Sequence, residues 1–295
     1  MNKAIFRMHC PDRAGIVHFV SGLIAKKLGG NISSTQELIV TGGGDGRPAR
    51  EFFMRVVWEQ KNGADCGETA SFFARHLRPY GAVFSVDDAD RRDRLALFAT
   101  REAHCLVEVL AAHYQDILPA EIPLIISNRE HEKVVNLAHM FNVNFYHVPY
   151  EGGMTPQERK KALKKQSDLL RDYGIDLVGL ARYMQIIPPA MIAKYRNRII
   201  NIHHSFLPAF VGARPYHQAY DRGVKKIGAT AHFVTARLDE GPIIEQDTEE
   251  VVDQSSVENY IEIGRGIEKR VFLGALRKYL ERKLIVHGNK VIVFT

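Results

Sequence analysis

The stretch that decides the fold is IINIHHSFLP, residues 199–208. It begins with apolar, β-branched residues that favour an extended strand, and Pro208 ends it in a loop. Similar strand-like runs precede it, separated by segments with helical periodicity, at residues 95–99, 124–127, 144–148 and 177–180. Strands that alternate with helices predict an α/β layer structure with a mainly parallel, Rossmann-like sheet.

The part of the chain after this stretch shows a different pattern of predicted elements. A loop that reads LDEGP, residues 238–242, lies between two β-rich segments. The elements expected here are these two segments, a long helix and a final hairpin, over residues 228–234, 243–252, 256–280 and 284–294. We therefore expect one α/β domain over residues 95–295.

The first part of the chain predicts a separate α+β unit. Its expected elements are strands over residues 4–9, 32–40, 52–58 and 83–86, with helices from Asp12 and over residues 68–77. This βαββαβ order is that of the ferredoxin-like split unit. The glycine-rich run 42–46 lacks the lysine-serine ending and the following helix of a phosphate loop, so it predicts a hairpin tip. The charged residues 88–94 predict a linker after a domain over residues 1–87.

The composition favours a globular protein of a reducing compartment. Cys10, Cys66 and Cys105 are widely spaced, which argues against a disulfide framework or a zinc knuckle. No signal core or lipid-spanning run is recognisable, so a cytoplasmic location without membrane association is expected. The net charge of +6 is dispersed, and the densest basic run, residues 158–165, follows a helix-start signal. A solvated helix face is favoured over a nucleic-acid-binding stripe.

Three side chains around this fold-deciding stretch suit acyl-transfer chemistry. Asn201 and His203 are two residues apart, so in a strand they point to the same side, whereas His204 points away and is expected to pack. An amide can hold an oxyanion, and an imidazole can move a proton. Asp239, in the later loop, can fix the histidine tautomer or activate water. Ligands bind at the carboxyl ends of strands in such sheets.

Other chemistries are less favoured by the pattern. A metal site at His203, His204 and Asp239 would need the adjacent histidines to converge, but neighbouring side chains on a strand diverge, so no metal is expected. Ser205 and Ser127 lack the glycines of a nucleophile elbow. Cys105 follows a histidine, but adjacent residues on a helix do not face each other.

Residues 180–189, LARYMQIIPP, follow the fourth strand of the expected sheet. Their side chains and free backbone groups could line a slot for a flat heterocycle such as a pterin. Ordinary packing of a helix on the sheet explains the same residues equally well.

These motifs together resemble a known family. Asn-Ile-His followed by Ser-x-Leu-Pro, with the later Leu-Asp-x-Gly-Pro, resembles the signature of the folate-dependent formyltransferase fold, and residues 180–184 resemble its pterin-binding stretch. Residues 10–17, CPDRAGIV, with Asn31 after the helix, resemble an ACT domain, a regulatory module for small molecules. With residues 206–216, the whole chain resembles the formyltetrahydrofolate deformylases.

The resemblance implies hydrolysis of 10-formyltetrahydrofolate to tetrahydrofolate and formate, in support of one-carbon and purine metabolism. By this resemblance Asn201 would bind the formyl oxygen, His203 would exchange protons, and Asp239 would orient water. No metal or redox cofactor is implied. The residues implied in folate binding are Leu180, Met184, Gln185, Ile187, Thr235 and Arg237. Two of these depart from the pattern. The family commonly has an acidic residue at the position of Arg237, and related transferases often have an arginine at the position of Gln185.

The ACT-like unit implies an amino-acid effector, with methionine and glycine as the family's candidates. Asp12, Gly15 and Asn31 are the residues that the resemblance assigns to it. Such modules bind ligands between paired copies, so a homo-oligomer is expected. A purely structural oligomerisation unit is the alternative.

The acceptor of the formyl group is inferred from one difference. Glycinamide ribonucleotide formyltransferases have a glycine-rich phosphate loop after the first strand, where this chain reads ATREAHC, residues 99–105. Without glycines the backbone cannot easily wrap a phosphate, which favours water. A formyltransferase to an amine, and a folate or amino-acid sensor without turnover, remain the alternatives.

Overall fold

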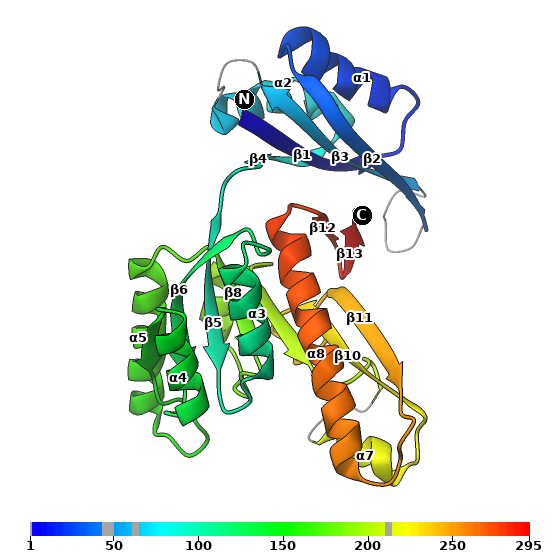
Figure 1. Cartoon of the computed structure of the whole chain (residues 1–295). Coiled ribbons are helices and arrows are strands. Elements are labelled where there is room, and N and C mark those ends of the chain that lie inside the picture. The colour runs from blue at the N-terminus through cyan, green and yellow to red at the C-terminus, as the bar shows by residue number, and fades with distance from the viewer. Residues whose placement is uncertain (1, 43–49, 61–64, 210–213) are drawn as a thin grey trace. The chain divides into compact units, whose positions relative to one another are not determined.

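The computed structural model describes residues 2–42, 50–60, 65–209 and 214–295. The chain forms two compact units (Figure 1). The first contains the residues up to Arg91 together with Glu281–Ile285 and Ile292–Thr295, and the second contains Arg92–Leu280 and Val286–Val291. The carboxy-terminal segments that the sequence analysis assigned to the second domain are thus shared between the units. The hairpin tip predicted at residues 42–46 lies, except for Gly42, outside the described residues.

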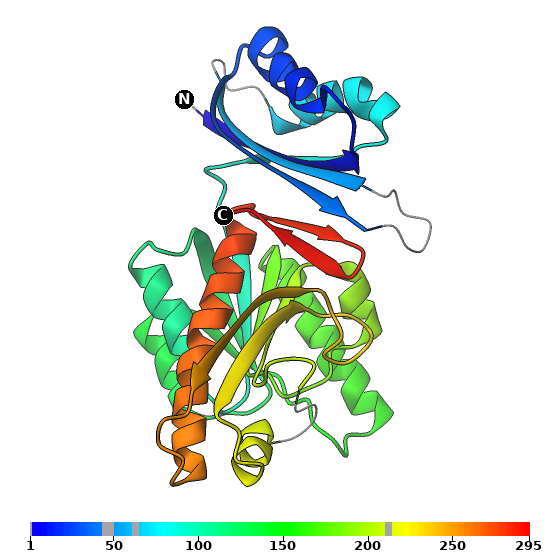
Figure 2. The same ribbon diagram turned by 90° about the vertical axis from the view of Figure 1, so that its right-hand side faces the viewer.

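The first unit is a four-stranded antiparallel sheet with helices on one face, which confirms the expected α+β class (Figure 2). Its sheet order is β2-β3-β1-β4. Its elements are β1 Asn2–Pro11, α1 Ile16–Gly22 with a π-helical turn Leu23–Lys27, β2 Asn31–Thr41, β3 Arg50–Gln60, α2 Cys66–Leu77, a 3-10 turn Arg78–Tyr80 and β4 Val83–Asp88.

The two faces of β3 pack differently because successive side chains of a strand alternate. Trp58 lies in the core beneath the helices, where the rings of Phe6 and Phe73 stack with centroids 4.4 Å apart. Phe53 points to the other face and packs against Ile292 and Phe294 of the carboxy-terminal segment. Each face of this sheet is therefore covered by apolar side chains of the same unit.

The second unit is built on a seven-stranded sheet of order β11-β10-β9-β8-β5-β6-β7. Strands β5 to β9 run parallel, and β10 and β11 add antiparallel strands at one edge. The mainly parallel sheet is confirmed. The strands are β5 Asp93–Ala99, β6 Ala120–Ser127, β7 Asn144–His147, β8 Leu177–Ala181, β9 Ile199–His203, β10 Lys226–Phe233 and β11 Ile243–Glu250. The hairpin of β12 Leu284–His287 and β13 Lys290–Val293 has residues in both units.

The helices of this unit follow the strands as expected of an α/β layer structure. They are α3 His104–Tyr114, α4 Glu132–Met140, α5 Pro156–Asp172, α6 Pro189–Lys194, α7 Pro215–Asp221 and α8 Val257–Leu280. The long helix α8 packs along β9, β10 and β11 and contacts α3 and α7 (Figure 1). Helix α5 begins in a capping box between Thr155 and Glu158, and its lysines 160, 161, 164 and 165 are exposed. The basic run is therefore a solvated helix face.

No helix in the described part of the chain combines the length and the apolar character needed to cross a bilayer. Helix α8 has the length but carries charged residues throughout, and its buried stripe packs on the sheet. Burial of one stripe of an amphipathic helix is how such a helix is stabilised in a globular fold.

Helix α8 receives the ring of Tyr216 at Gly264. A Cβ at Gly264 would lie 2.2 Å from the Cζ atom of Tyr216, so any side chain there would displace the ring. The Tyr216 hydroxyl reaches past this point and donates a hydrogen bond of 2.7 Å to the buried carboxylate of Glu268. The glycine thus fixes the approach of α7 to α8.

We predict that Gly264→Ala destabilises the second unit by about 1–3 kcal/mol, because the added methyl group overpacks a rigid ring. Gly266→Ala on the same helix is the matched control: its added Cβ would meet only the mobile end of the Arg270 side chain, at 3.8 Å, and alanine favours a helix. Urea titration of both variants measures the difference. Equal stability of the two variants would contradict the role of Gly264.

Candidate active site

The register of three strands places an amide beside an imidazole. Asn201 on β9 pairs with Leu180 on β8 and with His232 on β10, so these residues form one row across the sheet. The Asn201 Nδ2 atom lies 3.3 Å from His232 Nε2. His232 Nδ1 in turn donates a hydrogen bond of 3.0 Å to the Phe233 carbonyl, which leaves Nε2 as an acceptor in the neutral ring.

This hydrogen-bond pattern orients the Asn201 amide. Because His232 Nε2 accepts one N–H of the amide nitrogen, the NH₂ group and not the carbonyl is turned toward the histidine. Asn201 also lines a cavity, so its second N–H is available to a ligand there. His232 is a site residue that the sequence analysis missed. A single histidine in a β-rich segment gives no signal until its strand partner is known.

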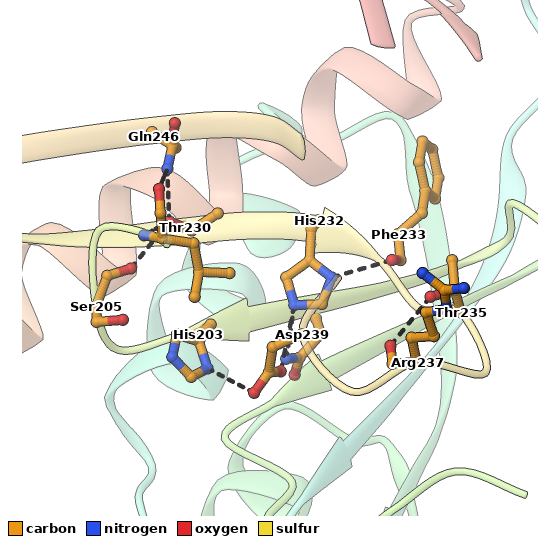
Figure 3. Close-up of polar contacts among 11 residues, drawn as sticks. His203, Ser205, Thr230, His232, Phe233, Thr235, Arg237, Asp239 and Gln246 are labelled. Carbon is orange, nitrogen blue, oxygen red and sulfur yellow. Dashed lines mark hydrogen bonds and ion pairs between the residues drawn. The ribbon is translucent and has the colours of Figure 1, made fainter. Parts of the chain in front are cut away.

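The predicted histidine and carboxylate meet as expected. His203 Nδ1 lies 3.3 Å from Asp239 Oδ2, and Asp239 Oδ1 lies 3.6 Å from His232 Nε2 (Figure 3). Hydrogen bonding from His203, the largest cause, holds the pKa of the Asp239 carboxyl well below its usual range although partial burial opposes this. The carboxylate therefore stays ionised. Among the described residues, His203 Nε2 has no hydrogen-bond partner, so this nitrogen can exchange a proton with a ligand.

Asp239 reaches this position from the loop between β10 and β11. Its backbone is left-handed, with φ of 55°. Two residues later, a Cβ at Gly241 would lie 1.6 Å from the Phe233 carbonyl oxygen, so only glycine fits where the loop folds back on β10. The Gly-Pro of the motif thus sets the turn that aims the carboxylate at His203.

The loop after β9 is held by Thr230, the strand partner of His203. The Thr230 hydroxyl donates to the Ser205 carbonyl at 2.9 Å and accepts from the Leu207 N–H at 3.0 Å. Gln246 on β11 donates to the same hydroxyl at 2.9 Å (Figure 3). These bonds fix the end of β9 and so the position of the His203 ring.

A cavity of about 380 Å³ opens beside these residues, within the range of small-molecule sites. The structure brings all nine residues predicted for catalysis and folate binding to its wall: Leu180, Met184, Gln185, Ile187, Asn201, His203, Thr235, Arg237 and Asp239. Met184 and Ile186 are exposed apolar side chains here. Thr100 supports this wall, because its hydroxyl accepts the Met184 N–H at 3.2 Å and donates to Asn128 at 2.7 Å.

A buried polar cluster adjoins the cavity and was also missed from the sequence. The Glu268 carboxylate accepts hydrogen bonds of 2.7 Å from His104 Nε2 and from the Tyr216 hydroxyl, and Arg182 Nε lies 3.4 Å away. Burial alone would raise the pKa of Glu268, but His104, Arg182 and Tyr216 together hold it below its ordinary value. A paired buried charge of this kind fixes the surrounding elements.

The cluster also contains a possible set of metal ligands, since atoms of His104, Cys105 and Glu268 lie within 4.8 Å of one another. Both carboxylate oxygens of Glu268 already accept hydrogen bonds, and the Arg182 cation adjoins them. Burial raises the pKa of the Cys105 thiol well above its usual value, so a thiolate is disfavoured. The same observation disfavours Cys105 as a nucleophile.

His204 packs as the strand geometry predicted. It is buried, and its ring meets the edge of the Tyr216 ring with centroids 6.0 Å apart. Burial, and then the nearby Arg182 charge, lower the pKa of His204 to about 3. The ring is therefore neutral at physiological pH and acts as a packed wall of the site.

The first unit has its own cavity of about 380 Å³. Two of the predicted effector residues, Asp12 and Gly15, line it, together with Arg13, Ile16, Val17, Glu37, Leu38, Ile39 and Phe52. Gly15 has φ of 83° at the start of α1, a conformation that glycine adopts without strain. Asn31, at the start of β2, does not line this cavity.

Comparison with known proteins agrees with this fold. A profile of the formyl transferase family matches residues 93–276. The chain belongs to this family. A formyltetrahydrofolate deformylase from Bacillus subtilis is 40% identical over 99% of this chain and 94% of its own length.

Solved structures of two kinds are similar. A formyltetrahydrofolate deformylase from Pseudomonas syringae pv. tomato superposes with a TM-score of 0.89 at 38% identity, covering 100% of this chain and 95% of that chain. A glycinamide ribonucleotide transformylase from Symbiobacterium toebii gives 0.63 at 32% identity and covers 69% of this chain and 95% of its own. The likeness to deformylases therefore extends over both units.

The neutral state of His204 predicts a pH dependence of stability. In the unfolded chain this histidine binds a proton below about pH 6.5, whereas the folded state binds it only near the lowered pKa. Stability therefore rises with pH across this window and is lost as the pH falls. We expect wild type to lose roughly 2 kcal/mol more than His204→Phe between pH 7.5 and 5.

Urea titration at the two pH values measures this difference. Phenylalanine keeps the ring against Tyr216 and removes the titrating group. Parallel losses in wild type and variant would show that His204 is not buried in its neutral form.

Proposed function

We propose that this chain is a hydrolase that converts 10-formyltetrahydrofolate and water into tetrahydrofolate and formate. The observation that carries the proposal is the convergence of Asn201, His203 and Asp239 on one cavity. The names of relatives that match nearly the whole chain support the same reaction.

Asn201, His203 and Asp239 each have a separate role in the proposed reaction. His203 Nε2 takes a proton from water as the water oxygen bonds to the formyl carbon, and the Asn201 amide donates to the oxygen that becomes negative. Asp239 accepts from His203 Nδ1 and stabilises the imidazolium that forms. When the carbon–N10 bond breaks, the proton on His203 passes to N10. The remaining hydroxyl proton is lost to solvent, so formate leaves as an anion.

The folate is proposed to lie between the loop after β8 and the loop after β10. Leu180, Met184, Gln185, Ile187, Thr235 and Arg237 supply the proposed contacts. The Arg237 side chain is exposed and lies near Glu240 at 3.4 Å, so the arginine at this position is partly neutralised by a neighbouring acid. Backbone N–H and C=O groups of these loops would then form hydrogen bonds with the edge of the pterin ring.

Water is the proposed acceptor because the loop after β5 serves another purpose here. Thr100 in this loop holds the Met184 backbone, and His104 at its end is bonded to Glu268. These groups are engaged inside the protein and do not form a glycine-rich phosphate cradle. A formyltransferase would require an amine that fits this wall, and a sensor would have no use for an oxyanion donor beside a proton shuttle.

The first unit, over residues 1–87, is proposed to be an ACT-like regulatory domain joined by residues 88–94 to the catalytic domain over 95–295. Its cavity beside Asp12 and Gly15 suits a small zwitterion, because Arg13 and Glu37 supply both charges next to the apolar Leu38. We infer methionine or glycine as effector and a homo-oligomer that pairs these domains. Asn31 would contribute from outside this cavity.

A cytoplasmic location is part of the same proposal. Folate chemistry of this kind serves metabolism inside the cell, and Cys10, Cys66 and Cys105 are all free thiols. Free thiols of this number suit a reducing compartment.

The direct test is formate release from 10-formyltetrahydrofolate in buffer without an amine. We expect release by wild type and a loss of about 10²–10³-fold in kcat for Asn201→Ala, which removes the oxyanion donor. Asp239→Asn is expected to lose most turnover while it still binds folate. Asp221→Asn, an exposed aspartate at the end of α7, is the control.

Two results would count against this mechanism. The absence of formate from wild type, with and without methionine, excludes the hydrolase. Full turnover by Asp239→Asn removes Asp239 from catalysis even if formate is released.

The effector is tested by calorimetric titration of the whole protein with methionine and with glycine. We expect one of them to bind and Asp12→Ala to weaken that binding at least tenfold. The exposed Lys27→Ala is the control. The absence of binding by both amino acids would leave the first unit with a structural role only.

A further inference from the structure

The catalytic cavity has a cationic wall that the proposed mechanism does not use. Arg182 directly follows β8 and lines the cavity together with His203 and His204. Its backbone is left-handed, with φ of 59°, as is that of Asp239 with φ of 55°. Residues held in this region cost energy and cluster at functional sites. Two charged residues of opposite sign are thus held in strained conformations on one cavity.

The Arg182 guanidinium has more donors than the protein uses. Its side chain is 14% exposed, and its contact with Glu268 is a charge contact of 3.4 Å. Both Glu268 oxygens already accept from His104 and Tyr216 at 2.7 Å. Within the described ranges, which omit residues 210–213, Nε and Nη1 of Arg182 have no hydrogen-bond acceptor. Buried donors of this kind are rarely left unsatisfied.

The other charged groups at the cavity do not serve as this acceptor or replace this cation. Asp239 contacts His203 and His232. Arg237 is 83% exposed and lies beside Glu240, and His204 is buried and neutral. Arg182 is therefore the largely buried cation of this wall, and Glu268 behind it keeps the guanidinium in place.

The proposed reaction creates an anion inside this cavity. The neutral formyl group becomes formate next to the ionised Asp239, and two like charges in a partly buried site repel. A guanidinium binds a carboxylate through two parallel N–H bonds, and a one-carbon carboxylate is the smallest that fits. Formate therefore has a matching partner on the wall of the same cavity.

We propose that Arg182 forms a product subsite that takes the formate anion as it leaves the catalytic trio. This inference rests on the proposed function for the origin of the formate. The subsite moves the anion away from the ionised Asp239, so that the catalytic trio is clear before the next substrate binds. It also makes formate a product inhibitor whose affinity depends on Arg182.

The experiment measures inhibition of turnover by sodium formate, with sodium chloride holding the ionic strength constant. Wild type is compared with the double variant Arg182→Met, Glu268→Gln, which removes both buried charges together. We expect the inhibition constant for formate to rise at least tenfold in the double variant. Arg265→Met, an exposed arginine of α8 paired with Glu102, is expected to leave it unchanged.

A second variant covers the case in which the double variant does not fold. Arg182→Lys keeps the charge beside Glu268 but loses the planar fork, and we expect its formate inhibition constant to rise by about threefold to tenfold. An inhibition constant equal to that of wild type, in a folded Arg182→Lys or double variant, overturns the subsite. Inhibition of wild type by chloride as strong as by formate overturns it as well.

Direct binding separates this proposal from the proposed function. Saturation-transfer NMR with ¹³C-formate detects the subsite in wild type without any turnover, and the signal should weaken in the Arg182 variants. A wild-type protein that binds formate but releases none from 10-formyltetrahydrofolate would lose the hydrolase function only. Turnover together with the same formate signal in wild type and variants would overturn the subsite only.

Discussion

The pairing of β9 with β8 on one side and β10 on the other is the constraint on which the site depends. This register places Leu180, Asn201 and His232 in one row, and it puts His203 opposite Thr230. A slip by one residue would turn Asn201 and His203 to the other face of the sheet. Because β9 is an inner strand with both neighbours in place, backbone hydrogen bonds hold the positions of Asn201 and His203, and contacts with His232 and Asp239 then orient their side chains.

The charged side chains beside this row of residues come from loops. Asp239 and Arg182 each lie in a left-handed conformation, which costs roughly 1–3 kcal/mol for a non-glycine residue. The tight return at Gly241 and the contact with Glu268 oppose this cost. The result is a cavity with an anion beside the histidines and a cation on the same wall. In the proposed hydrolysis of a neutral formyl group to an anion, the first serves the attack by water and the second the departure of formate.

The same buried contacts separate this site from one that would seat a large acceptor. Thr100 and His104, at the carboxyl end of β5, are bonded to the loop after β8 and to α8. Tyr216 fits against Gly264 and completes the hydrogen bonds of Glu268. Thr100, Tyr216 and Glu268 are thus hydrogen-bonded inside the protein, and these bonds are costly to open for a second substrate.

The sequence by itself determined the elements of both units and part of the site. Alternation along a strand put Asn201 and His203 on one side, and the Leu-Asp-x-Gly-Pro loop supplied Asp239, because these patterns are local. The tertiary structure alone decided that His232 and Glu268 belong to the same site, and that Glu268 pairs with Arg182 of the predicted slot. Their signals were absent from the sequence because each acts through strand register or helix docking between residues distant along the chain. The tertiary structure also left Asn31 outside the cavity of Asp12 and Gly15. It grouped Glu281–Ile285 with the first unit, because the spacing of apolar residues in a segment does not specify the surface on which that segment packs.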